Sequence, residues 1–224
     1  MATRLYFSSS VSAPQSVGFG TNWSDTNSAG KYALLTEKNG ESLVTGITQD
    51  FSVGSRCLDR QFVSPQISNS VFINGQVACQ LMCREFNNGD NTVTAFAARV
   101  ITASGTNRGD LLVATKWFGP GSELINNATM RNMAFTSGTI MTSVTALPND
   151  RLVVEIGFDT NGGATPQGAA RYGAPVDVAD LPQNMTQTTS GVGWVEFVSN
   201  VTFVGGAATV IVPLLMMNRF RMAS

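Results

Sequence analysis

The sequence predicts an all-β protein, an antiparallel β-sandwich of the jelly-roll-like kind with few short helices. Apolar residues alternate with polar or small ones over residues 150–158, and the turn dipeptide Asn-Gly occurs four times. No segment keeps a three-to-four-residue apolar spacing over more than two helical turns. Many short strands separated by regular turn signals favour a sandwich or jelly roll, and no internal repeat points to a propeller or solenoid.

The clearest predicted strand covers residues 150–158. Successive side chains of a strand point to opposite faces, so one face carries only apolar side chains: Leu152, Val154, Ile156 and Phe158. The other face carries Arg151, Glu155 and Gly157, and Val153 is its apolar exception. We expect the first face in the sandwich core and the second face in contact with water or another protein.

Asn74-Gly75 marks a hairpin between residues 71–73 and 76–83. Residues 161–184 are rich in Gly, Ala and Pro, which indicates a long loop that could build a binding surface. The last clear strand is 193–203, with four residues expected in the core: Val195, Phe197, Val201 and Phe203. Further strands are expected over four ranges: 92–102, 110–115, 130–135 and 139–147.

The 224 residues are expected to form a single β-sandwich domain, 1–224. Within it, residues 1–30 are predicted to be an N-terminal arm or edge segment, and residues 205–224 a C-terminal apolar strand or tail. The start of the sequence lacks the apolar core of a signal peptide, and the longest apolar run is too short for a transmembrane helix. We expect synthesis in the cytoplasm and no membrane partner.

Charged residues make up 13% of the chain and the net charge is -1, so a nucleic-acid partner is not expected. The absence of histidine removes the usual general base and the commonest zinc ligand. Glu155 and Glu196 are a possible pair of acids, but charge facing solvent on a strand is commoner. We therefore expect no enzyme and no cofactor.

Two other patterns could hold a ligand, and each has a simpler explanation. Residues 159–162 resemble the opening of a calcium loop, but Ala170 occupies the position of the closing glutamate. Arg108-Gly109-Asp110 matches a short integrin-binding sequence, for which local pairing is the simpler account. Cys57, Cys79 and Cys83 are too few for a disulfide framework and are expected to be buried.

Trp117 precedes turn residues and is the candidate for contact with a glycan, since sandwich domains often bind sugars with exposed aromatic rings. Packing in the core or in an interface is the alternative for its ring. The loop predicted over 161–184 is the second place where a glycan could bind.

Residues 207–217 are apolar on both faces of an extended chain, with only Thr209 polar. Both faces must be covered, either by the two sheets of one sandwich or by a neighbouring subunit through strand addition or swapping. The candidate subunit-interface residues are Val210, Ile211, Val212, Leu214, Leu215, Met216, Met217 and Phe220.

Five stretches, taken together, resemble the structural proteins of tailed bacteriophages: 1–7 with Ala13-Pro14 and Trp23, 60–65, 108–112, 150–157 and 194–197. The resemblance implies a jelly-roll-like β-sandwich in a capsid or tail, where many copies assemble without a cofactor. It carries over no functional residues.

We therefore predict a structural component of a bacteriophage virion, most strongly a capsid decoration or cement protein. Its expected partners are other virion proteins, either major capsid or tail subunits, and further copies of itself in a homo-oligomer. The alternative is a tail or fibre component that recognises a glycan on the host surface.

Overall fold

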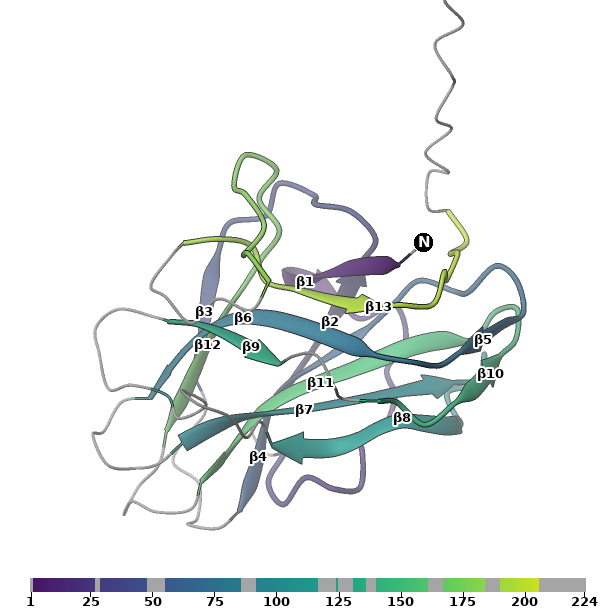
Figure 1. Cartoon of the computed structure of the whole chain (residues 1–224), viewed down its shortest axis with the longest axis horizontal. Helices are drawn as coiled ribbons and strands as arrows, with labels where there is room; N and C mark the ends of the chain where they lie inside the picture. The colour runs from purple at the N-terminus through teal and green to yellow at the C-terminus, as the bar shows by residue number, and fades with distance from the viewer. Residues whose placement is uncertain are drawn as a thin grey trace, which may run out of the picture.

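The computed structural model describes residues 2–26, 29–47, 55–85, 92–116, 124, 131–135, 140–160, 167–183 and 190–205. Thirteen strands and no helix lie in these residues, which confirms the all-β class (Figure 1). The few short helices that we expected are not found in the described ranges. None of the described segments is a helix long and apolar enough to cross a bilayer.

The strands are numbered in the order in which they follow one another along the chain. They are β1 (Thr3–Ser12), β2 (Gly30–Leu35), β3 (Val44–Ile47), β4 (Arg56–Val63), β5 (Val71–Ile73), β6 (Val77–Glu85), β7 (Thr92–Ile101), β8 (Asn107–Lys116), β9 (Arg131–Phe135), β10 (Val144–Ala146), β11 (Arg151–Thr160), β12 (Gly168–Tyr172) and β13 (Trp194–Phe197).

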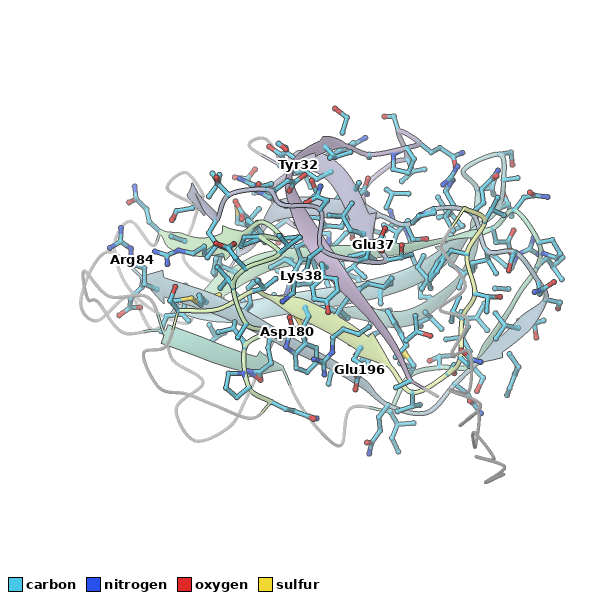
Figure 2. The ribbon with its side chains drawn as sticks, turned by 90° about the horizontal axis from the view of Figure 1, so that it is seen from above. Tyr32, Glu37, Lys38, Arg84, Asp180 and Glu196 are labelled. Carbon is cyan, nitrogen blue, oxygen red and sulfur yellow. The ribbon has the colours of Figure 1, made fainter. Side chains whose placement is uncertain are left out.

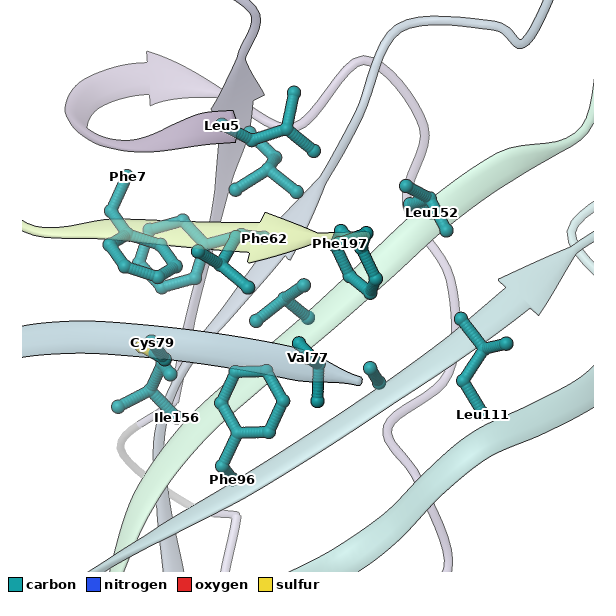
Figure 3. Close-up of a cluster of buried hydrophobic side chains, with 14 of the residues drawn as sticks. Leu5, Phe7, Phe62, Val77, Cys79, Phe96, Leu111, Leu152, Ile156 and Phe197 are labelled. Carbon is teal, nitrogen blue, oxygen red and sulfur yellow. The ribbon is translucent and has the colours of Figure 1, made fainter. Parts of the chain in front are cut away.

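Eleven of the strands form one folded-over sheet, in the order β3-β12-β6-β13-β1-β2-β4-β11-β7-β8, with β9 added to β6. One layer contains β6, β13 and β1, and the other contains β4, β11, β7 and β8 (Figures 1 and 3). Strand β2 joins the layers because it pairs with β1 and also with β4. The β2–β4 pair is parallel, whereas the other strand pairs of the described chain are antiparallel.

The core lies between the two layers, where β13 and β6 pass over β11 and β7 (Figure 3). Phe7 and Phe62 approach to 4.8 Å between ring centroids, and Phe62 also contacts Tyr172. The residues that the sequence analysis placed in the core have these positions: Leu152, Val154, Ile156, Phe158, Val195 and Phe197 are fully buried, Val201 is buried, and Phe203 is partly buried against the same cluster.

The outer face of β11 differs from the expected wet surface. Glu155 and Val153 are both buried there, because the chain between β1 and β2 crosses over this face. Trp23 and Phe19 of this crossing segment pack against the outer side of β7 and β4. Glu155 was expected to contact water or another protein, but a part of the same chain covers it instead.

The expected loop over 161–184 contains a strand among its described residues. Strand β12 pairs with β6 and β3 inside the sheet. Its composition is explained by close packing, since a β-carbon at Gly168 would overlap the ring of Phe158. The Gly- and Ala-rich sequence, which suggested a loop, instead allows the strand to lie against a large core side chain.

The predicted N-terminal arm, residues 1–30, contains strand β1, which pairs with β13 on one side and β2 on the other. The turn at Asn74-Gly75 connects β5 to β6, and Gly75 has a positive φ of 81°. The hairpin expected there is not formed, because β5 pairs with β10 in a separate two-stranded sheet whereas β6 pairs with β12, β13 and β9. The Asn-Gly pairs at 88–89 and 161–162 lie outside the described residues.

Candidate functional site

Glu155 is the most elaborately bonded side chain on the outer face of β11. Its carboxylate accepts hydrogen bonds from Trp23 Nε1 at 2.7 Å, from Gln61 Nε2 at 2.8 Å and from the Gly20 backbone N–H at 3.0 Å. Arg99 of β7 adds an ion pair at 3.1 Å. The two carboxylate oxygens are thus occupied by groups of this chain, so Glu155 holds the crossing segment to the sheet.

A polar pocket of about 200 Å³ opens beside this carboxylate. Side chains of the crossing segment and of β8 line it, among them Phe19, Asn22, Asn107 and Asp110. Asn107 donates a hydrogen bond to Asp110 at 3.0 Å. Amides, a carboxylate and an aromatic ring form a wall that suits a small polar ligand, although Glu155 itself has no free oxygen to offer.

A second buried acid lies between the layers, at the end where β4 meets β12. Asp59 accepts a hydrogen bond of 2.6 Å from the Tyr172 hydroxyl, and burial raises the pKa of Asp59 to about 6. The guanidinium of the adjacent Arg60 lies 4.4 Å from the ring of Tyr32 and 4.5 Å from the ring of Tyr172. This cluster is closed by Gly46 of β3, where a β-carbon would crowd both charged side chains.

A third charged cluster covers the outer face of the other layer, around Asp180 (Figure 2). Arg4 bridges Asp180 at 3.0 Å and Glu196 at 2.9 Å, and Lys38 reaches Asp180 at 2.6 Å. Burial alone would raise the pKa of Asp180, but the bonds from Lys38, Arg4 and the Tyr6 hydroxyl lower it. Arg4 also lies over the ring of Trp194, 4.0 Å from its centroid.

The structure does not bring Glu155 and Glu196 together. Glu155 lies on the outer face of β11, whereas Glu196 lies on the outer face of β13 in the opposite layer, where it pairs with Arg4. Their separation removes the two-acid arrangement that a glycoside hydrolase would require. Trp194, which precedes Val195 on β13, is fully buried, and its indole N–H donates a hydrogen bond to the carbonyl oxygen of Leu181.

The described residues contain no cluster of three or more potential metal ligands. Asp159 pairs with Arg56. Arg108, Gly109 and Asp110 lie in strand β8 rather than in a loop, and Arg108 forms a salt bridge with Asp150. The acids that suggested ligand sites in the sequence therefore serve to connect strands and segments of this chain.

An apolar groove of about 300 Å³ lies where β2 passes from one layer to the other. Its lining includes Val11, Pro14, Leu35, Val63, Pro65 and Val204. Val11 is 44% exposed and Val204 is 52% exposed, so these valines present apolar surface to solvent. The groove was not foreseen from the sequence, because its residues come from five separate parts of the chain.

Several residues selected from the sequence lie outside the described residues. Trp117 is one of them, and so are all the candidate subunit-interface residues between 210 and 220. Their roles stay predictions. The groove nevertheless lies beside the point where the chain leads into that segment, since Val204 lines the groove and Gly205 is the last described residue.

No protein-family model and no curated protein matches the sequence. The fold is similar to part of SACOL2612, a CocE/NonD family hydrolase from Staphylococcus aureus, with a TM-score of 0.50 and 8% identity. That match covers 90% of this chain and 37% of the hydrolase. VP2 of infectious bursal disease virus, in its subviral particle, is a weaker neighbour with a TM-score of 0.34 and 12% identity, over 86% of this chain and 46% of VP2.

The likeness to a hydrolase contradicts the expectation that the chain is not an enzyme. A lack of histidine argued against common catalytic mechanisms, but the same all-β architecture forms a part of an enzyme. The chain spans just over a third of that hydrolase, so the likeness shows the fold alone. It assigns no reaction and no reactive residue to this chain.

Proposed function

We propose that the chain is a structural subunit of a bacteriophage particle, most specifically a capsid decoration or cement protein. The observation that carries the proposal is the apolar groove at the layer junction, which lies beside the start of an equally apolar segment, residues 207–217. The resemblance of five stretches of the sequence to tailed-phage structural proteins supports the same role.

The charged side chains favour a structural role, because they are paired with one another within the chain. Glu155, Asp159 and Asp180 are each paired with a cation of this chain. The apolar surface at the groove has no such partner among the described residues. Burial of apolar surface against a neighbour is the usual core of a protein interface, with polar groups at its rim. Ser12, Gln66 and Arg151 would provide that rim here.

Removal of residues 213–224 tests the proposal. All the core residues identified among the described residues precede position 206 and are kept in the shortened chain, which is therefore expected to fold. We expect it to lose binding to particles that lack the protein, while the full chain binds. Circular dichroism serves as the control for folding. A folded, shortened chain that still joins particles normally would refute the proposed role of the C-terminal segment.

A second candidate function is recognition of a host-surface glycan by a tail or fibre component. The polar pocket beside Glu155 favours it, because amides, a carboxylate and aromatic rings gather there. Binding to a glycan array that is lost in Asn107→Ala would support the pocket as the site. Loss in Trp117→Ala would support Trp117 instead. Absence of any glycan binding, together with tight attachment to capsid shells, would favour decoration.

A further inference from the structure

We propose that the apolar groove binds residues 207–217 of a second copy of this chain, so that two copies exchange their C-terminal segments. This inference deepens the proposed structural role and rests on it. It names the partner of the groove as another copy, whereas the structural role alone would be satisfied by a groove that binds a different virion protein.

The groove and residues 207–217 are both mainly apolar. The groove is lined mainly by aliphatic side chains and two prolines, and residues 207–217 contain no charged residue. Such a segment gains stability by leaving water, and the groove offers it an apolar surface that is still exposed at Val11 and Val204. Arg151 is the one charged residue of the groove lining, and its guanidinium already donates a hydrogen bond of 2.8 Å to the carbonyl oxygen of Ser64, so it can remain at the rim.

The groove takes side chains rather than a further β-strand. Pro14 and Pro65 have no backbone N–H to donate. Strand β2 is already paired with β1 and β4, and β4 is already paired with β2 and β11. Because these strands already have partners, the bound segment is held by its apolar side chains, a few of which fit in the groove of about 300 Å³.

The place where the segment begins makes a symmetric pair feasible. Val204 lines the groove, and the apolar segment starts three positions later, at Ala207. In a two-fold dimer with the grooves facing each other, each segment would begin beside its own groove and reach the groove of the partner. A self-complementary patch of this kind is what a two-fold interface requires.

The apolar character of both faces favours a second copy over the same chain. A groove that is open on one side covers one face of an extended segment and leaves the other face in water. In a dimer with facing grooves, both faces of the segment would be covered. One face would contact the rim of its own groove, and the other face would contact the groove of the partner copy. A segment folded back onto its own groove would still expose half of its apolar side chains.

Sedimentation of the full chain tests the inference with a matched pair of variants. Val11 and Val44 are both 44% exposed valines, but only Val11 lines the groove. We expect the natural chain and Val44→Glu to sediment as dimers or larger species, and Val11→Glu to dissociate with at least a tenfold weaker affinity. Equal sedimentation of the two folded variants would overturn the inference.

Cysteine cross-linking shows whether the segment in the groove comes from a second copy or from the same copy of the chain. Val11→Cys combined with Leu214→Cys should give a disulfide-linked dimer on oxidation, and Val44→Cys with Leu214→Cys should not. The natural cysteines are buried and should not interfere. A cross-link formed only within one copy would overturn the exchange between copies.

The two proposals fail in different ways. A chain that dimerises through the groove but does not bind particles refutes the structural role alone. A chain that binds particles as a monomer, with Val11→Glu as active as Val44→Glu, refutes the segment exchange alone.

Discussion

The indole Nε1 of Trp23 donates a 2.7 Å hydrogen bond to Glu155 Oε2, although the two residues lie 132 positions apart. This bond fixes the segment between β1 and β2 to the outer face of β11. It also explains why a glutamate on an apparently wet strand face is only 1% exposed. The covering segment supplies the donors that a buried carboxylate needs.

Loss of this bond should measurably weaken the fold. Trp23→Phe keeps an aromatic ring but removes the N–H, and a hydrogen bond to a charged group contributes about 2 kcal/mol. Glu155→Gln should cost more, about 3 kcal/mol, because it leaves the buried Arg99 without its ion pair. Urea unfolding of both variants and of the double variant would measure these costs. Additive losses would show that Trp23 and Glu155 are not coupled.

The pH dependence of stability should report on Asp59. Burial raises its pKa in the folded chain from 3.8 to about 6, so the unfolded chain releases this proton first as pH rises. The free energy of unfolding should therefore be highest below pH 4 for this group. It should fall by about 2 to 3 kcal/mol as pH rises through 6.

Asp59→Asn provides the control for this pH effect. The amide oxygen can still accept the hydrogen bond from Tyr172 but does not titrate. Other carboxyl groups contribute equally in both chains and cancel in the difference. The natural chain should thus lose stability relative to the variant between pH 4 and pH 7 in urea titrations. Parallel pH profiles would show that Asp59 ionises normally in the folded chain.

The period of two in residues 152–158 was enough to predict which side chains of β11 enter the core, since strand geometry links sequence position to face. The same pattern could not reveal what lies on the other face. Glu155 looked exposed because its partners, Gln61, Arg99 and Trp23, are brought to it only by the fold. The Gly-rich β12 was missed for a similar reason, because its glycine meets Phe158 only in the folded sheet.

The groove likewise could not be predicted from the sequence. Val11, Leu35, Pro65 and Val204 carry no common motif, and each is unremarkable among the apolar residues of its own segment. Residues 207–217, by contrast, were recognisable because a local run of apolar residues is visible in sequence. A segment that must be covered can be predicted from sequence, but the surface that covers it depends on tertiary structure.

Gly157 should be intolerant of any side chain. A β-carbon there would overlap the carbonyl oxygen of Cys57 on the neighbouring strand and the ring of Trp23. Because backbone cannot move aside as a flexible side chain can, Gly157→Ala should cost about 1 to 3 kcal/mol in urea unfolding. Gly18→Ala is the matched control, since nothing lies within 4 Å of the added methyl group. Similar stabilities of the two variants would contradict the close approach of β11 to β4.

The three cysteines should be unreactive while the chain is folded. Burial raises the pKa of Cys57 to about 12 and also raises the pKa values of Cys79 and Cys83, so little reactive thiolate exists near neutral pH. We expect no reaction with an aromatic disulfide reagent at pH 8 under native conditions, and three reactive thiols per chain in urea. Slow reaction in the absence of urea would measure local opening of β4 or β6. Rapid modification of one thiol in the folded chain would place that cysteine at the surface and contradict its burial in the core.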